Sequence, residues 1–349
     1  MYRFISFLLV LSFCFIGCDQ AESNSSSSNG TKVYVAGMEY EYNDYSVKTQ
    51  KVKYWVDGEE TTLSDYSTAY GYSIALDDGD IYVAGCQYEK NDEGNYRNVA
   101  KYWLNGEEVE LTDASYSAGA YDITIDGDDV YVAGYENSDD NYIAKYWKNG
   151  EEVELTDGTY NGYSYSIFVN NDDVYVAGYE DSDDDYIAKY WLNGTEVELS
   201  DGTDKAMAYS IYVNNDDVYV AGYEDSSKYI AKYWLNGTAV ELTDDTYNAK
   251  AYSLVVDNGS VYVAGYEDSD EEDIAKYWVD GVAVDLTDGT YDACAEAIAV
   301  DNGDVYVAGW EKNSDGYYDA KYWKNGSEVI LSDGDFSAYG YSIALDTDN

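Results

Sequence analysis

The sequence contains no histidine among its 349 residues. This absence excludes Ser-His-Asp and Cys-His nucleophile arrangements, histidine general acid–base catalysis and every metal site that needs an imidazole ligand. Basic residues are also scarce, because 19 Lys and Arg stand against 70 Asp and Glu and leave a formal charge of −51. Such a charge repels phosphate backbones and anionic surfaces, so we expect no nucleic-acid partner.

Apolar runs long enough to cross a membrane are lacking as well. Residues 4–16, which follow Arg3, form an apolar run that is too short to span a bilayer and is typical of an export signal. The run ends in Phe15-Ile16-Gly17-Cys18, which resembles the bacterial lipobox. This resemblance implies a lipoprotein signal peptide at residues 1–17 and a diacylglycerol thioether on Cys18. The alternative is an ordinary signal peptide with an incidental cysteine.

The segment that follows has no means of packing into a core. Residues 19–30 (DQAESNSSSSNG) are rich in serine and show no apolar periodicity. We therefore predict that residues 18–31 comprise the lipid-bearing cysteine and a flexible tether. Of the other cysteines, Cys14 lies in the signal, and Cys86 and Cys294 fall in non-neighbouring repeats, so we expect no structural disulfide.

The rest of the chain is built from seven repeats. The segment Val-Tyr-Val-Ala-Gly, with Ile once in its first place, begins at Val33, Ile81, Val130, Val174, Val218, Val261 and Val305, a spacing of 43 to 49 residues. Each copy carries four short runs typical of strands, separated by Asn-Gly, Asp-Gly and Asp-rich turns. Four strands per repeat at this period predict an all-β chain with a seven-bladed β-propeller over residues 32–349.

The two ends of the repeat region complement each other. Tyr339 to Asp346 (YGYSIALD) repeats Tyr70 to Asp77 letter for letter, but no second strand follows it. Val33 to Gly37, conversely, has no first strand before it. We therefore predict that the C-terminal strand completes the N-terminal blade and closes the ring.

At this point the chain resembles a known group of proteins. Asp304 to Gly309 (DVYVAG), taken with the strand before it and with the AKYW segments, is similar to the β-propeller repeats of bacterial secreted and surface proteins. The resemblance covers nearly all of residues 32–349. It implies the fold but not the function, because propellers serve as binders, scaffolds and enzymes.

One basic position recurs in every repeat. The lysine of the KYW segment appears seven times, and a glutamate two residues after the repeat glycine appears six times, with Gln87 in the remaining copy. In a hairpin these two positions lie on one face of neighbouring strands. We interpret Lys145 with Glu136, and Lys189 with Glu180, as structural ion pairs. Seven identical lysines cannot all serve one active site.

Positions that differ between repeats are better candidates for ligand recognition. Just before each innermost strand, a variable residue stands between two small ones, and we expect these residues around the mouth of the central channel. We select Tyr70, Tyr163, Met207, Lys250 and Tyr339 as candidate ligand contacts. A tolerant loop position is an equally good interpretation.

Loops on the same face are acidic and aromatic. We expect Tyr116, Tyr160, Tyr247 and Tyr291 there, together with Asp183 and Asp185. Such a face suits a glycan, a cationic peptide or Ca²⁺. The match to an EF-hand loop fails because the glycine and glutamate that this loop requires are absent, so we predict no cofactor, with Ca²⁺ as the alternative.

These features together favour a lipid-anchored, monomeric binding or scaffold protein of the cell envelope, on the periplasmic side or at the cell surface. Its expected partner is a protein, peptide or glycan outside the cytoplasm. We predict that it is not an enzyme. One alternative is a carbohydrate-active enzyme that uses carboxylates. Its candidate residue is Glu296, which stands where other repeats have tyrosine. The other alternative is a purely structural or adhesive component.

Overall fold

The computed structural model describes residues 30–42, 48–64, 68–138, 141–182, 185–269 and 272–347. The chain divides into two units, Met1–Gly30 and Thr31–Asn349. The predicted signal peptide, Cys18 and Asp183 lie outside the described residues. Within those residues, no helix is long and apolar enough to cross a membrane.

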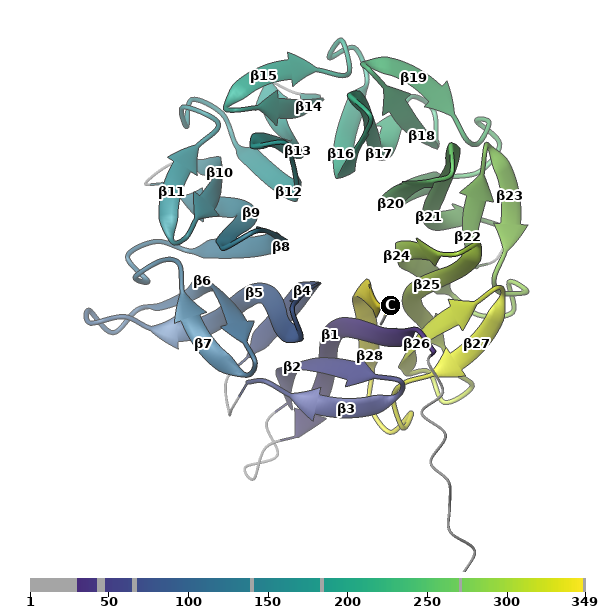
Figure 1. Cartoon of the computed structure of the whole chain (residues 1–349), viewed down its shortest axis with the longest axis horizontal. Coiled ribbons are helices and arrows are strands. Elements are labelled where there is room, and N and C mark those ends of the chain that lie inside the picture. Colours follow the sequence, from purple (N-terminus) through teal and green to yellow (C-terminus); the bar gives the residue numbers. More distant parts are fainter. Residues whose placement is uncertain are drawn as a thin grey trace, which may run out of the picture. The chain divides into compact units, whose positions relative to one another are not determined.

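The second unit is a ring of seven antiparallel sheets, each with four strands (Figure 1). The predicted all-β, seven-bladed propeller is thus confirmed. The innermost strands are β4 (Ala69–Asp77), β8 (Ala118–Asp126), β12 (Gly162–Asn170), β16 (Lys205–Asn214), β20 (Ala249–Asp257), β24 (Ala293–Asp301) and β28 (Ala338–Asp346). The second strands are β1 (Lys32–Tyr42), β5 (Asp80–Lys90), β9 (Asp129–Asn137), β13 (Asp173–Ser182), β17 (Asp217–Asp225), β21 (Ser260–Asp268) and β25 (Asp304–Lys312).

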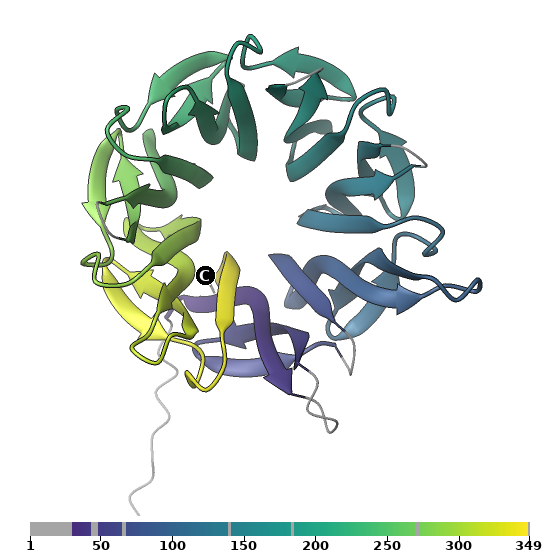
Figure 2. The same cartoon turned by 180° about the vertical axis from the view of Figure 1, so that it is seen from behind.

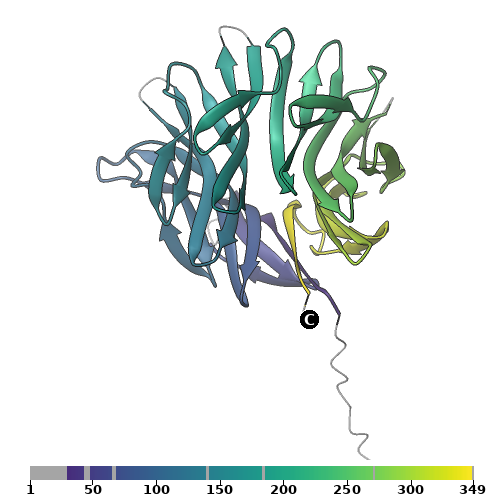
Figure 3. The same cartoon turned by 45° about the horizontal axis from the view of Figure 1, so that its top comes forward.

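The third strands are β2 (Lys48–Val56), β6 (Tyr96–Leu104), β10 (Tyr142–Lys148), β14 (Asp185–Leu192), β18 (Tyr229–Leu235), β22 (Asp273–Val279) and β26 (Tyr318–Lys324). The outermost strands are β3 (Glu59–Thr62), β7 (Glu107–Glu110), β11 (Glu151–Glu154), β15 (Thr195–Glu198), β19 (Thr238–Glu241), β23 (Val282–Asp285) and β27 (Ser327–Ile330). Because the strands alternate in direction, tight turns lie at one end of each blade, and the longer hairpin loops and blade-to-blade connections lie at the other (Figure 3). We call this second end the loop face.

Local sequence sets the tight turns and the strand register. Asn149 and Gly150 both adopt positive φ, 51° and 82°, as a two-residue hairpin turn between β10 and β11 requires. The Asn149 side-chain oxygen also accepts a hydrogen bond from the Val130 N–H at 2.9 Å. The turn thereby fixes the pairing of Trp147 with Val132 on the neighbouring strand.

The two ends of the repeat region meet in one blade. Its strand order is β28-β1-β2-β3, and Val33 and Val35 pair with Leu345 and Ile343 (Figure 2). The predicted closure by the C-terminal strand is thus confirmed. Closure pairs the inner edge of β1 with β28, so that this blade has four strands like the others.

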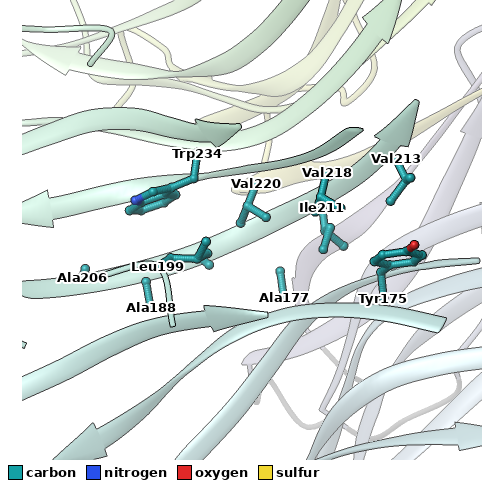
Figure 4. Packing of buried hydrophobic residues seen from close by; sticks show 11 residues of the cluster. Tyr175, Ala177, Ala188, Leu199, Ala206, Ile211, Val213, Val218, Val220 and Trp234 are labelled. Carbon is teal, nitrogen blue, oxygen red and sulfur yellow. The ribbon is translucent and has the colours of Figure 1, made fainter. Parts of the chain in front are cut away.

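The core lies between the blades. Figure 4 shows one such seam, where Trp234 and Val220 of one blade face Ala177 and Ala188 of the blade before it. The repeated tryptophan is at most 1% exposed in every blade. A large side chain packed against small ones fills the wedge between two twisted sheets. The burial of each such aromatic ring contributes on the order of 2 to 3 kcal/mol to stability. The repeat is therefore stable only beside its neighbours.

Candidate functional site

Each innermost strand carries a β-bulge close to the loop face. In β12 the register with β13 shifts between Ser164 and Ser166, so Tyr165 has no partner residue on β13. A bulge redirects the side chain of the extra residue. The same shift occurs in all seven blades and singles out Tyr72, Tyr121, Tyr165, Tyr209, Tyr252, Glu296 and Tyr341.

Six of these residues form a ring of touching tyrosines around the propeller axis, which we call the axial tyrosine ring. The centroids of neighbouring rings are 5.0 Å apart for Tyr72 and Tyr121, 5.0 Å for Tyr121 and Tyr165, 5.3 Å for Tyr165 and Tyr209, 5.2 Å for Tyr209 and Tyr252, and 6.0 Å for Tyr341 and Tyr72. Burial raises the pKa of every one of these phenols above its usual value. The ring therefore presents neutral aromatic faces and hydroxyls at neutral pH.

Glu296 takes the seventh place and interrupts the aromatic ring. Its Oε1 accepts a hydrogen bond from the indole N–H of Trp310 at 2.9 Å. Burial raises the pKa of Glu296, and the hydrogen bonds from Trp310 and Cys294 and the charge of Lys250 act in the opposite direction. This sector of the ring is thus the one where an acidic side chain replaces tyrosine, with Lys250 close to it.

The five residues predicted at the channel mouth lie two positions before the bulge, and all five are half-buried. Tyr163 contacts Tyr135 and Tyr142 of the preceding blade, with ring centroids 5.1 Å apart in both cases. We use the term inter-blade seat for such a site, which lies between aromatic rings of one blade and is occupied by a side chain from the next blade. Tyr339 fills the corresponding seat beside Trp310 and Tyr318, at 5.7 and 5.3 Å.

Lysine fills one of these seats. The ammonium of Lys250 lies 4.6 Å from the ring centroid of Tyr223 and 4.8 Å from that of Tyr229. Burial lowers the pKa of Lys250, while nearby carboxylates and the Cys294 thiol oppose this. The Tyr209 O–H donates to the sulfur of Met207 at 3.3 Å. Tyr70 stacks on Tyr72 at 5.8 Å and is hydrogen-bonded to Gln50 of the preceding blade.

The residues predicted on the acidic and aromatic loops lie further from the axis. Tyr116, Tyr160 and Tyr291 are exposed on the blade-to-blade connections, and Tyr247 is half-buried. Tyr247 and Tyr291 line separate grooves of about 510 and 470 Å³. Asp185 is half-buried at the first position of β14. Among the described residues, no group of three or more Asp, Glu or Cys is placed to hold a metal ion.

Two carboxyl groups stand opposite each other near the charged sector. Asp268 and Asp273 are Cα partners at the ends of β21 and β22. Burial, together with the hydrogen bond and the charge of Asp268, raises the pKa of Asp273 to about 7. In the other described hairpins of this type, tyrosine, glutamine or asparagine occupies the position of Asp273.

The repeated lysines each approach acidic side chains. The Lys145 Nζ lies 2.7 Å from both Glu136 and Glu152, and the Lys189 Nζ lies 2.7 Å from Glu180. Sequence reasoning missed Glu152, which belongs to the outermost strand. A signal existed, because a glutamate follows the lysine by seven residues in five of the repeats.

The blade in which Gln87 replaces the repeated glutamate still has a buried ion pair. The Lys101 Nζ lies 2.5 Å from Glu89, two residues beyond Gln87 on the same strand. Only a lengthened hairpin makes Glu89 part of β5. This compensation was missed from the sequence.

No family model matches the chain, and no curated protein matches its sequence. Three solved structures are similar to the chain, and one of them is described as a β-propeller. The β-propeller domain of the Trilobed protease from Pyrococcus furiosus, described as having an open velcro topology, matches with a TM-score of 0.54 and 13% identity, over 86% of this chain and 95% of that one. A mutant of AofleA from Arthrobotrys oligospora matches with a TM-score of 0.43 and 12% identity, over 78% and 90% of the two chains. A puromycin-hydrolyzing peptidase of Mycobacterium tuberculosis matches with a TM-score of 0.38 and 10% identity, over 77% and 53%.

These comparisons correct one prediction. We expected that the protein is not an enzyme, but the β-propeller domain of a protease is among the similar structures. Neither the fold nor its repetition therefore excludes an enzymatic function. At 13% identity, the likeness to the protease propeller shows the fold alone.

Proposed function

We propose that this propeller is a binding protein of the cell envelope, held to a membrane by a lipid on Cys18, which takes a basic segment of a protein or peptide at the loop face. The observation that carries the proposal is the axial tyrosine ring with Glu296 in its seventh place. Aromatic faces attract organic cations, and a carboxylate among them adds a charge-assisted hydrogen bond.

The chain's own lysines support this choice of ligand. The Lys250 ammonium lies between two tyrosine rings of an inter-blade seat, and the ammonium groups of Lys205 and Lys48 lie 5.1 and 3.7 Å from the centroids of Tyr186 and Tyr40. Each contact of this kind contributes about 0.5 to 2 kcal/mol, depending on how far the cation is desolvated. A lysine from a partner would meet the same chemistry at Glu296.

Long-range charge acts in the same direction. A net charge of −51 attracts a basic partner from a distance and accelerates its association, and added salt weakens this effect. The same charge disfavours acidic partners.

The test measures binding of a fluorescent oligolysine peptide to the full-length chain by anisotropy, at low and high salt, with oligoglutamate as the ligand control. We expect Glu296→Gln to weaken oligolysine binding about fivefold or more, because it replaces the one carboxyl group in the ring that can pair with an ammonium. The matched control is Glu154→Gln, which changes an exposed glutamate on the outermost strand β11. Equal binding of oligoglutamate, or equal effects of the two substitutions, would overturn the proposal.

A further inference from the structure

Lys250 is the charged residue among the seven that stand two positions before a bulge. The matching residues of the other blades are Tyr70, Gly119, Tyr163, Met207, Cys294 and Tyr339. Tyrosine packs well at this place, because Tyr163 and Tyr339 each lie against two aromatic rings of the blade before them. The packing of the blades therefore does not require a lysine here.

The ammonium of Lys250 lacks the partners that the buried lysines of the KYW segments have. Each of those seven lysines forms an ion pair with a glutamate. In the described part of the chain, no carboxylate lies within ion-pair distance of Lys250, and its ammonium donates no hydrogen bond. It lies against the faces of Tyr223 and Tyr229. The three N–H donors of this half-buried side chain are thus unused.

The surroundings of this ammonium do not compensate its burial. Burial lowers the pKa of Lys250, and the charges of Cys294, Asp225, Asp273 and Glu296 oppose this from beyond ion-pair distance. The cost of removing a polar group from water is offset only when the group finds a hydrogen-bond partner. The ammonium stays accessible to solvent, because the fully buried side-chain atoms without a partner belong to other residues. A ligand can therefore bring the missing acceptor.

Charge decides which acceptor suits this position. A hydrogen bond from an ammonium to a carboxylate is about twice as strong as one between neutral groups. A free anion, however, is repelled by the net charge of −51 on the chain. A carboxylate that belongs to a ligand of net positive charge avoids this repulsion and still pairs with the ammonium.

We propose that Lys250 binds a carboxylate carried by the basic segment that the loop face takes. This inference rests on the proposed function and adds to it the part of the ligand that carries negative charge. Lys250 and Glu296 belong to neighbouring innermost strands, β20 and β24 (Figure 1). The carboxylate of the segment meets Lys250 while a cation of the same segment meets Glu296. The C-terminal carboxylate and the side chain of an internal glutamate both supply this chemistry.

The test measures binding of three fluorescent peptides to the full-length chain by anisotropy, in high salt, where long-range attraction is screened. The first peptide is hexalysine with an amidated C-terminus, and the second is hexalysine with a free C-terminal carboxylate. The third is the amidated peptide with a glutamate inserted at its centre. A carboxylate lowers the positive charge of a peptide, so long-range attraction alone predicts weaker binding of the second and third. We expect instead that at least one of them binds about tenfold more tightly than the first, equivalent to ~1.4 kcal/mol.

Two substitutions at Lys250 should remove this advantage of the carboxylate. Lys250→Tyr introduces the residue that Tyr163 and Tyr339 place in equivalent seats, and it brings no ammonium. Lys250→Met copies Met207 of the preceding blade. Melting temperatures equal to that of the parent check that both variants fold.

The matched control is Lys205→Asn, which removes a loop-face lysine two innermost strands away from Glu296. The ammonium of Lys205 also lies over a tyrosine, 5.1 Å from the ring centroid of Tyr186, and the side chain is half-buried. Asparagine stands at the matching places Asn161 and Asn248, so the substitution suits the fold. It removes the same charge from the loop face and should change the advantage of the carboxylate by less than about twofold.

Three results would each refute the role of Lys250. They are equal binding of all three peptides, an advantage of the carboxylate that survives both Lys250 substitutions, and an equal loss of the advantage in Lys205→Asn. In all three cases the amidated hexalysine still binds, so the proposed function stands. If none of the peptides binds the parent, the proposed function fails together with this inference. Glu296→Gln should weaken all three peptides alike, because it acts on their cations.

Discussion

Replacing Lys145 by methionine tests the buried ion pairs that recur around the ring. The Lys145 side chain is 3% exposed and approaches Glu136, which is 18% exposed, and Glu152, which is 55% exposed. Lys145→Met keeps the apolar stem but leaves Glu136 without its cation. Breaking a fully buried pair costs about 3 to 5 kcal/mol. Because Glu152 remains hydrated, we expect a loss of about 2 to 3 kcal/mol in the free energy of unfolding.

The same strand provides a control. Lys148 pairs with Asp129 at 2.7 Å, but the two side chains are 44% and 38% exposed. Exposed pairs contribute ~0 to 1 kcal/mol, so Lys148→Met should change stability little. Urea unfolding followed by tryptophan fluorescence measures both variants without the added ionic strength of guanidinium. The double variant Lys145→Met with Glu136→Leu should recover much of the loss, since an apolar pair removes the stranded charge.

The pH dependence of this pair has a definite sign. Burial lowers the pKa of Lys145, but its hydrogen bonds to Glu136 and Glu152 raise the pKa by more. The pair therefore contributes fully below the unfolded lysine pKa of about 10.4, and the contribution is lost as the pH rises through the higher folded value. Equal stability of Lys145→Met and Lys148→Met at pH 8 would refute the reasoning. So would a parent-to-variant difference that disappears near pH 6.

Two further predictions concern other parts of the chain. Asp273→Asn should raise the free energy of unfolding by about 1 to 2 kcal/mol above pH 7, after discounting for solvent screening. The reason is that the pKa of Asp273 is raised to about 7, so its ionised form destabilises the fold. Thermal melts should show the gain fading toward pH 4, and a gain that is constant with pH would contradict this cause. Cys18→Ser should abolish incorporation of labelled palmitate and release the chain from membranes, which fractionation of cells expressing both forms measures; continued labelling would remove the lipid anchor from the proposed function.

Much of the fold follows from local pattern. Strand alternation and Asn-Gly turns can be read within one repeat. Comparison of the seven copies gives the number of blades, and the mismatch between the two chain ends predicts β28 beside β1. The pairing of Lys145 with Glu136 follows from the same period of two. These features depend on residues close together in sequence or on identical strands, and so they remain visible in the sequence alone.

The candidate sites depend on contacts that no repeat contains by itself. A one-residue bulge places Tyr165 in the axial ring, whereas variation between the repeats singled out Tyr163, whose side chain packs into a seam between blades. The β5–β6 hairpin and the connection between β7 and β8 together line a groove of about 810 Å³, which neither segment forms alone. The sequence by itself determined the number, order and closure of the blades, because hydrogen-bond periodicity and turn chemistry are local. Only the tertiary structure decided which side chains meet at the axis and at the rim, because bulges and inter-blade packing depend on register and on neighbours about 45 residues away.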